Sequence, residues 1–424
     1  MSIAVRGLTP AQFGRRPARP SAFEALNFVA PLTVSAVLVV RFQPFYNAVK
    51  FPGFVSSALV PALCVAVLAT TPSQRLRSIP IVWSTMALAL WFVMSRGWTL
   101  SAGATDFAIR SEVPALVLTA LVAGTIEPRV LVRTLTITFV GIVVWSLGVS
   151  LLSVDAREVE LAGGDEKQVG FLGLFDHKNL LGVFSVYTLG LVLAFVRGSW
   201  RWPLIAVTVG TIVGTRSATA AGGLLVAIFL WSWILAIGSR RTPRERALLR
   251  IASLVSAVSA VLVTVQALPA LLDIYQKDLT FSGRTVIWAE TWRFVTERPL
   301  LGYGFGGVWT ESPPTAVLDL RRRVGFAASH AHSGPLGLWL EVGVIGLVLF
   351  ASLAGAVASA SMWCLRKAAL HSYGVWGVIT LASMLLMSAS EPLYDGPDLC
   401  LLAVVVVVLL RTRNDARGAD GLDG

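Results

Sequence analysis

The feature that most constrains this chain is a series of long apolar runs that recurs from one end of the sequence to the other. Most runs approach the ~20 residues that an α-helix needs to cross the hydrocarbon core of a bilayer. The apolar residues are continuous and do not alternate with polar ones, so the pattern favours helices over a β-barrel. Only 14% of the residues are charged, whereas a soluble protein carries roughly a quarter. The sequence therefore predicts an all-α, polytopic transmembrane helical bundle.

About twelve membrane helices are predicted, and the distribution of charge orients them. With the basic N-terminal segment placed in the cytoplasm, the inner segments hold twenty of the 35 basic residues but only six of the 24 acidic ones. Every inner connection then obeys the positive-inside rule, and both termini are expected to be cytoplasmic. The predicted spans are 24–40, 53–71, 79–95, 108–126, 134–153, 179–196, 203–216, 219–238, 249–268, 335–361, 373–390 and 398–411.

The domain organisation follows from these spans. Residues 1–22 are polar and basic, and we expect them to form a disordered cytoplasmic tail. Residues 23–411 form the predicted transmembrane domain, and 412–424 a second cytoplasmic tail. Two outer connections are too long to be simple turns: the segment 154–178, which is acidic at its start, and the outer loop 269–334, which is large enough to contain short amphipathic helices.

The long outer loop has recognisable parts. A helix is predicted from about Gly283 to Arg298, because apolar residues recur there at helical spacing. Pro299 ends it, since proline cannot continue the hydrogen-bond ladder, and the glycine-rich turn LLGYGFGG follows. The loop closes with SHAHSGP, which leads directly into the next membrane helix, where Ser333 or Gly334 can act as the cap.

Cationic and imidazole side chains gather on the predicted outer face, which is otherwise acidic. Arginine forks match the geometry of phosphate oxygens and keep their charge at any working pH, and a helix N-terminus adds backbone N–H donors to an anion site. Histidine is well suited to act as a general base near neutral pH. The pattern therefore indicates an anion-binding site with a base beside it. The set consists of His177, Lys178, Asn179, Arg216, Arg284, Arg293, Arg298, Arg321, Arg322, Arg323, His330 and His332.

Simpler interpretations of the same residues stay open. The loop helix could lie on the membrane with its tryptophans among the headgroups, and Arg321 to Arg323 could contact anionic lipids. Arg216 could extend to the phosphates of the bilayer. His330 and His332 could be a metal pair, but no cluster of Cys, Asp or Glu lies near them in the sequence, so we expect no metal.

The sequence disfavours a role for the cysteines and a nucleic-acid partner. The three cysteines, Cys64, Cys364 and Cys400, fall within or at the ends of apolar runs, and none is placed for a disulfide or a metal site. The net charge is +11, but no cluster of Lys and Arg is interleaved with aromatic residues on a soluble domain. We therefore expect no nucleic-acid partner.

Four stretches of the sequence resemble a known family. The sequence resembles the O-antigen ligase/polymerase family of bacterial membrane glycosyltransferases, particularly its exopolysaccharide-polymerase branch. The likeness covers most of the chain after about residue 130, and the third and fourth stretches are the most specific. They are GLFDHKNLLG (173–182), GTRSATAAGG (214–223), SGRTVIWAETWRFVTERPLLGYGFG (282–306) and SHAHSGPLGLWLEVGVIGL (329–347).

The resemblance implies an enzyme of the bacterial cytoplasmic (inner) membrane. Such proteins are metal-independent glycosyltransferases that use a glycan on undecaprenyl diphosphate as donor and need no cofactor. They transfer the glycan, on the outer face, to a hydroxyl of a lipid or glycan acceptor. A ligase uses a lipid core, whereas a polysaccharide polymerase uses another lipid-linked repeat. The DHKN stretch at 176–179 favours the polymerase.

The resemblance also implies roles for particular residues. Arg216 and Arg284 match the expected ligands of the diphosphate, and Lys178, Asn179 and Arg293 are further candidates on the donor side. His332 is the favoured catalytic base, with His330 as second choice. Ser333 departs from the family, which commonly has Asn at this position. Serine can still cap a helix, so the departure bears on the role of that position and not on the fold.

Two other classes of function are alternatives to the enzyme. A transporter or flippase of a lipid-linked glycan usually carries ionisable residues near the midplane of the membrane, often on broken helices. Here the predicted spans hold almost no central charges, and the cations cluster at one surface. A non-catalytic membrane assembly protein would not require the set of histidines and arginines. The pattern therefore favours surface chemistry.

Overall fold

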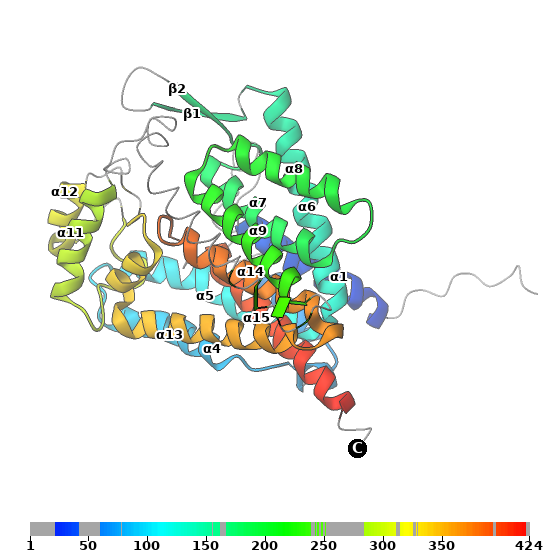
Figure 1. Cartoon of the computed structure of the whole chain (residues 1–424). Coiled ribbons are helices and arrows are strands. Elements are labelled where there is room, and N and C mark those ends of the chain that lie inside the picture. The colour runs from blue at the N-terminus through cyan, green and yellow to red at the C-terminus, as the bar shows by residue number, and fades with distance from the viewer. Residues whose placement is uncertain are drawn as a thin grey trace, which may run out of the picture.

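The chain folds as a bundle of helices with one two-stranded hairpin (Figure 1). Nearly all of the predicted tail 1–22 and of the predicted span 249–268 lies outside the residues that the structure describes. The computed structural model describes residues 22–41, 60–77, 79–154, 156–161, 167–238, 242, 244–245, 247–248, 251, 284–310, 314–324, 328, 330–392 and 396–420.

The helices confirm the prediction of a polytopic membrane bundle. Every predicted span other than 249–268 coincides with a helix. By length and composition, α5, α6, α7, α9, α13 and α14 could each cross a membrane. Parts of α1, α2 and α8 are shorter apolar helices. The bounds are α1 Ala22–Arg41, α2 Val60–Thr70, α3 Ser73–Arg77, α4 Trp83–Met94, α5 Ala102–Thr125, α6 Pro128–Leu152, α7 Lys178–Phe195, α8 Arg201–Gly214, α9 Ala218–Gly238, α11 Arg284–Glu297, α12 Thr315–Val324, α13 Gly334–Leu365, α14 His371–Met387 and α15 Gly396–Asp420.

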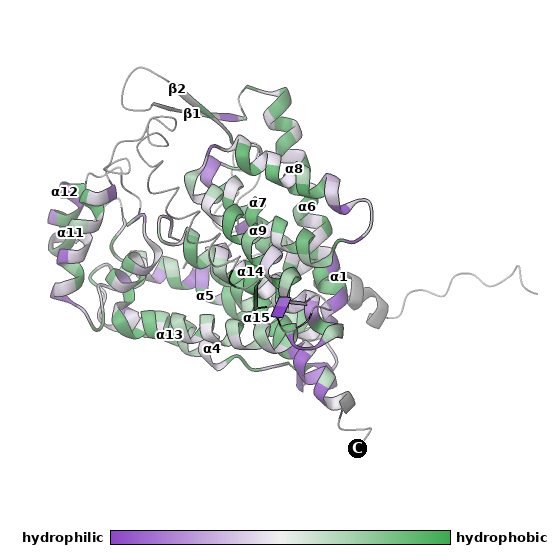
Figure 2. Cartoon of the chain, viewed as in Figure 1, coloured by the Kyte–Doolittle hydropathy of each residue, from purple (hydrophilic) through white to green (hydrophobic). Residues whose placement is uncertain are grey.

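The helices of the bundle differ in hydropathy from α11, α12 and the last part of α15. Figure 2 shows the helices of the bundle mainly hydrophobic, whereas α11, α12 and the last part of α15 carry hydrophilic residues. The core runs through α7 and α15, where the stretch from Cys400 to Leu409 is buried. Helix α15 continues to Asp420, through most of the segment 412–424 that is predicted as a tail. The outer loop contains α11 and α12, as the sequence predicts.

A β-hairpin that the sequence analysis does not predict lies in the connection 154–178. Strand β1 (Arg157–Leu161) pairs antiparallel with β2 (Lys167–Phe171), and Arg157 lies opposite Phe171. The hairpin is pressed against the turn between α8 and α9, where a side chain at Gly214 would collide with the Phe171 ring. This contact holds the turn in place beside the start of α7.

Helix α13 is broken near its start. Gly343 has φ 71° and ψ −178°, which divides the helix after its first nine residues and is a conformation that favours glycine. The break leaves backbone N–H and C=O groups of α13 without partners inside the helix. The glycine-rich turn after α11 forms hydrogen bonds with these groups. The bonds are Tyr303 N–H to Leu340 O (3.0 Å), Gly304 N–H to Glu341 O (2.8 Å) and Val344 N–H to Pro299 O (2.9 Å). They fix α11 against the first part of α13.

Several helix ends meet at one end of the bundle, which we call the site end. The Gly334 amide at the start of α13 donates to Ser388 O after α14 (2.6 Å). The start of α15 lies level with the middle of α7, where the Tyr187 hydroxyl donates to Asp398 Oδ1 (2.6 Å). Segments far apart in the sequence are thereby brought together around the short connection between α14 and α15.

Candidate functional site

Glu391 is the centre of a polar cluster at the site end. It follows α14, and only 8% of its surface is exposed. Asn179 Nδ2 donates to its Oε1 at 2.8 Å, and Arg284 Nη2 donates to the same oxygen at 3.1 Å. Arg284 Nη1 also donates to Ser390 O at 2.7 Å. The carboxylate therefore joins the start of α7, the start of α11 and the connection after α14.

The two histidines of the outer loop lie against this carboxylate. The ring centroids of His330 and His332 are 4.0 Å apart. One side-chain ligand atom from each of His330, His332 and Glu391 lies within 4.8 Å of the others. Trp288 of α11 donates its Nε1–H to His332 O at 3.1 Å. The histidine segment is thus fixed both by α11 and by the turn that carries Glu391.

The hydrogen bonds distinguish the two imidazoles. His330 Nδ1 accepts the backbone N–H of His332 at 3.1 Å. This bond assigns the proton of a neutral His330 ring to Nε2. His332 Nδ1 is buried and has no hydrogen-bond partner among the described residues. His332 therefore has a ring nitrogen that its neighbours do not occupy, which a general base requires.

Two of the predicted site residues have an uncommon backbone conformation. In the described part of the chain, Arg216 (φ 52°) and His332 (φ 49°) are the non-glycine residues with positive φ. Non-glycine residues rarely adopt this region, and such residues cluster at functional sites. Because φ is positive, each of these two side chains leaves the backbone in a different direction from the side chain of a residue with negative φ.

Arg216 is joined to the cluster through its own turn. It lies between α8 and α9 and is exposed, and its side chain has no hydrogen bond or ion pair to the described residues. Thr219, three residues later, hydrogen-bonds the Ser390 hydroxyl at 2.8 Å. The turn that carries Arg216 is therefore attached to the residue that precedes Glu391.

The DHKN stretch begins α7 and brings one of its residues to the cluster. His177 is the N-cap, and its Nδ1 accepts the backbone N–H of Asn179 at 3.1 Å. Lys178 is buried, with 3% exposure, and lies beside Gly170 of the hairpin. The side-chain amide of Asn179 hydrogen-bonds Glu391 and is therefore part of the cluster. Lys178 lies next to the hairpin instead.

Arg293 does not join this cluster. It lies nine residues after Arg284 on α11, about 14 Å along a helix axis. Its guanidinium pairs with Asp319 of α12 at 2.7 Å and with Glu290 at 3.3 Å, on the exposed face of the loop. Hydrogen bonds from Arg293 and Arg323 hold the pKa of Asp319 below its usual value. A role for Arg293 in diphosphate binding stays a prediction that this position does not support.

The sequence analysis did not single out Glu391 and gave His177 no role. The signal for Glu391 is weak: a single carboxylate between Ser390 and Pro392, in a short connection between the last two spans. It could be found as one of the two acidic residues, with Asp395, in the connection between the predicted spans 373–390 and 398–411. Nothing in the sequence pairs it with Arg284, which lies 107 residues earlier.

The comparison with known families identifies the part of the chain that builds most of this site. Residues 203–351 match the family described as O-Antigen ligase. This part of the chain is similar to the O-antigen ligase family. The resemblance predicted from the motifs is thereby confirmed. The O-antigen ligase region runs from α8 into α13 and includes Arg216, Arg284, His330 and His332, whereas Asn179 and Glu391 lie outside it.

A curated relative is similar over a different share of the chain. The chain is 27% identical over 197 residues to the "Exopolysaccharide production protein ExoQ" of Rhizobium meliloti (strain 1021). The aligned part covers 42% of this chain and 44% of the relative. The match therefore spans less than half the length of each protein.

The histidines of the O-antigen ligase region are held neutral by their surroundings. Burial, together with electrostatic interactions with His332, Arg284 and His177, lowers the pKa of His330 to about 3. Burial and the positive charges of Arg284 and His177 lower the pKa of His332 to about 4. Burial raises the pKa of Glu391, and the Arg284 guanidinium opposes that rise. Near neutral pH both rings are therefore unprotonated, and His332 is the one whose Nδ1 has no hydrogen-bond partner among the described residues.

The lowered pKa values of the two histidines predict how activity and stability depend on pH. We expect kcat/KM for glycan transfer to show no acid limb near pH 6.5, because His332 in the free protein stays unprotonated until about pH 4. The unfolded histidine binds a proton near pH 6.5, so the free energy of unfolding should fall as the pH drops from there toward 4. Initial rates measured between pH 4.5 and 8 test the first expectation. A limb near 6.5 that vanishes in the His332→Asn variant would contradict it.

The cluster also contains donors that a metal ion could use. His330, His332 and Glu391 together resemble the ligand set of a divalent cation. However, the Arg284 guanidinium already donates to the same carboxylate, and a fixed positive charge in contact with a ligand opposes a second cation. The charge of Arg284 therefore disfavours a metal ion at this cluster.

Removal of metal is expected to leave activity intact. We expect glycan transfer to proceed at an unchanged rate after the protein has been treated with EDTA and transferred to chelated buffer. The comparison is with the same protein to which Mg²⁺ or Zn²⁺ has been added back. A loss of transfer that is restored by either ion would assign the cluster to a metal.

Proposed function

We propose that this chain is a membrane glycosyltransferase that transfers a glycan from polyprenyl diphosphate to an acceptor hydroxyl. The observation that carries the proposal is the convergence of Arg284, Asn179, His330 and His332 on the buried carboxylate of Glu391. These groups come from three separate regions of the chain. An arginine, an amide and a neutral imidazole are the groups that diphosphate departure and proton transfer need.

The donor diphosphate is assigned to the arginines. Arginine has five N–H donors, and the bonds from Arg284 to Ser390 and Glu391 use one hydrogen each of Nη1 and Nη2. Its remaining donors can bind phosphate oxygens while Glu391 holds the guanidinium in position. Arg216 is exposed on a turn attached to the same cluster. We assign the second phosphate of the leaving group to Arg216.

The acceptor is activated by His332 in this proposal. The acceptor oxygen attacks the anomeric carbon of the donor sugar as His332 takes the hydroxyl proton. A new glycosidic bond forms, and the bond between the anomeric carbon and the diphosphate oxygen breaks. The bonding electrons leave with the polyprenyl diphosphate, whose charge the arginines stabilise. Glu391 stabilises the imidazolium that His332 becomes, because opposite charges a few ångströms apart attract.

Among acceptors, we favour another lipid-linked glycan, which makes the reaction a polymerisation. The relative in Rhizobium meliloti is named for exopolysaccharide production, and the DHKN stretch supports the same branch. A lipid-core acceptor, as in a ligase, is the alternative within the enzyme. The assignment to the outer face of the bacterial cytoplasmic membrane rests on the positive-inside distribution of charge.

A transporter or flippase of a lipid-linked glycan is the alternative from another class. Helix α13 is broken at Gly343, and broken helices occur in transporters. The buried carboxylates Glu341 and Asp398 lie seven and two residues from the starts of α13 and α15. Glu341 is therefore within about 11 Å of the site end, whereas Asp398 accepts a hydrogen bond from Tyr187 in the middle of α7. Against the transporter alternative stands the cluster of histidines and arginines at the site end, which supports chemistry at one surface.

The proposal is tested by a transfer assay on the full chain in nanodiscs. A glycan on polyprenyl diphosphate is supplied with chelated buffer, and the release of polyprenyl diphosphate and the length of the glycan are measured. We expect release to accompany chain extension. Movement of intact donor across a sealed vesicle without release would support the transporter instead. Transfer to a lipid core, with no extension of the lipid-linked glycan, would assign the ligase.

A further inference from the structure

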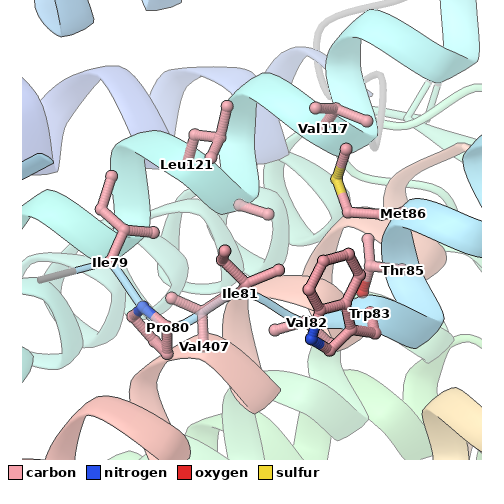
Figure 3. A pocket seen from close by; sticks show the side chains of 11 residues that line it. Ile79, Pro80, Ile81, Val82, Trp83, Thr85, Met86, Val117, Leu121 and Val407 are labelled. Atoms are coloured by element: carbon pink, nitrogen blue, oxygen red, sulfur yellow. The ribbon is translucent and has the colours of Figure 1, made fainter. Parts of the chain in front are cut away.

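An apolar groove lies at the other end of the bundle, away from the polar cluster. It has a volume of about 340 Å³, within the range of about 300–1,000 Å³ typical of ligand pockets. Figure 3 shows that its lining comes from the connection into α4, from the first residues of α4 itself, from α5 and from α15. The lining is almost entirely apolar and includes Ile81, Met86, Val117, Leu121 and Val407.

The groove is open toward the lipid-facing surface. Ile81 is 61% exposed and Trp83 is 76% exposed, although both are large apolar side chains. Trp83 is the first residue of α4, and tryptophan prefers the boundary between hydrocarbon and headgroups. The groove therefore begins at the level of the headgroups and extends among helices toward the hydrocarbon.

Basic side chains gather at the mouth of the groove. Ile79 packs against Gly124, whose carbonyl accepts a hydrogen bond from Arg411 of α15. The charge of Arg75 on α3 acts on Arg411. Arg77, two residues before Ile79, is exposed and has no hydrogen bond or ion pair to the described residues.

Acidic groups are also present at this mouth. Glu127 and Asp415 act electrostatically on Arg411, so part of its charge is balanced. Arg75 and Arg77 add two further positive charges on α3, within five residues that include no acidic side chain. The mouth of the groove therefore keeps a net positive character.

We propose that the groove binds one acyl chain of an anionic phospholipid whose phosphate lies against α3. Basic residues beside a membrane attract anionic headgroups, and each contributes about 1 kcal/mol near the surface. The apolar lining takes the chain, and Arg77 supplies charge that no described residue neutralises. The lipid belongs to the leaflet on the side of α3, which is the cytoplasmic one in the proposed orientation.

The polyprenyl donor is a poor fit to this groove. Val407 lies nine residues after Asp398 on α15, about 14 Å further from the site end. A donor whose diphosphate is bound at Arg284 would have no negative charge at α3. The positive mouth is explained by a ligand that carries its own phosphate there. This exclusion of the donor rests on the proposed function, whereas the lipid binding itself can be tested without the transfer reaction.

The test is native mass spectrometry of the full chain in detergent with equal amounts of phosphatidylglycerol, phosphatidylcholine and undecaprenyl phosphate. We expect phosphatidylglycerol adducts to exceed phosphatidylcholine adducts by about fivefold or more, as ~1 kcal/mol per arginine implies. Val117→Trp fills the groove and should remove adducts of both phospholipids. Arg75→Gln with Arg77→Gln should lower phosphatidylglycerol to the level of phosphatidylcholine.

Leu90→Trp is the matched control for the groove variant. Leu90 is 59% exposed on α4 but does not line the groove, so lipid adducts should be unchanged. The exposed arginine variants keep the test decisive if Val117→Trp does not fold. Equal adducts of both phospholipids on the unaltered chain would overturn the proposal. Displacement of phosphatidylglycerol by undecaprenyl phosphate would overturn it too and assign the groove to the donor.

Discussion

The His332→Asn variant is expected to transfer glycan about 10²–10⁴-fold more slowly than the unaltered protein, the range for loss of a general base. Asparagine tolerates positive φ, so it can adopt the backbone conformation that His332 has, with φ 49°. The variant therefore removes the base without adding backbone strain. An alanine at this position would combine the two effects.

Single-turnover transfer with bound donor is the appropriate measurement, because it isolates chemistry from substrate binding. His330→Asn is the matched control. His330 Nδ1 accepts the backbone N–H of His332, and an asparagine oxygen can accept the same bond. We expect a smaller loss in this control. Equal rates in His332→Asn and the unaltered protein would exclude His332 as the base, and a larger loss in His330→Asn would reverse the assignment.

Arg284→Ala is expected to lower both stability and transfer. The side chains of Arg284 and Glu391 are 15% and 10% exposed, so the change leaves a nearly buried carboxylate without its cation. Removing one partner of a buried pair typically costs about 3–5 kcal/mol. Transfer should fall by about 10²–10³-fold, as when one preorganised donor to a developing negative charge is lost.

A double variant separates the two effects of Arg284. In Arg284→Ala with Glu391→Gln, the residue at 391 is neutral, so the thermal midpoint should recover most of the loss seen in Arg284→Ala. Transfer should not recover, because the donors to the diphosphate are still missing. Recovery of both quantities would mean that Arg284 only neutralises Glu391. Arg323→Ala, which removes an exposed ion pair with Asp319, is the control for loss of a surface arginine.

The helical architecture could be predicted because a bilayer imposes a strong pattern on sequence. Runs of apolar residues place α5, α6, α7, α9, α13 and α14, and Pro299 marks the end of α11. The break in α13 could not be predicted in this way. Gly343 lies in a run that is apolar apart from Glu341, and its conformation depends on the turn at Leu300 and Leu301 that packs against it. That contact is tertiary and leaves no local signal.

The candidate site could be predicted in part. Arg284, His330 and His332 lie in stretches that resemble the family, and the structure brings them together. Glu391 could not be predicted, because its partner Asn179 is 212 residues away. Arg293 is also an arginine and lies on the same helix as Arg284, yet it pairs with Asp319 on the exposed side. Residue type and proximity in sequence do not determine which arginine points inward.

The position of Glu391 near the end of the chain has a consequence for biosynthesis. Ribosomes release a chain from its N-terminus onward, and segments fold as they emerge. Arg284, His330 and His332 are therefore made before the carboxylate that aligns them. A nascent chain that ends before residue 391 contains these groups without their common acceptor. The protein is expected to remain inert toward lipid-linked glycans until residue 391, which follows α14, has been added to the chain.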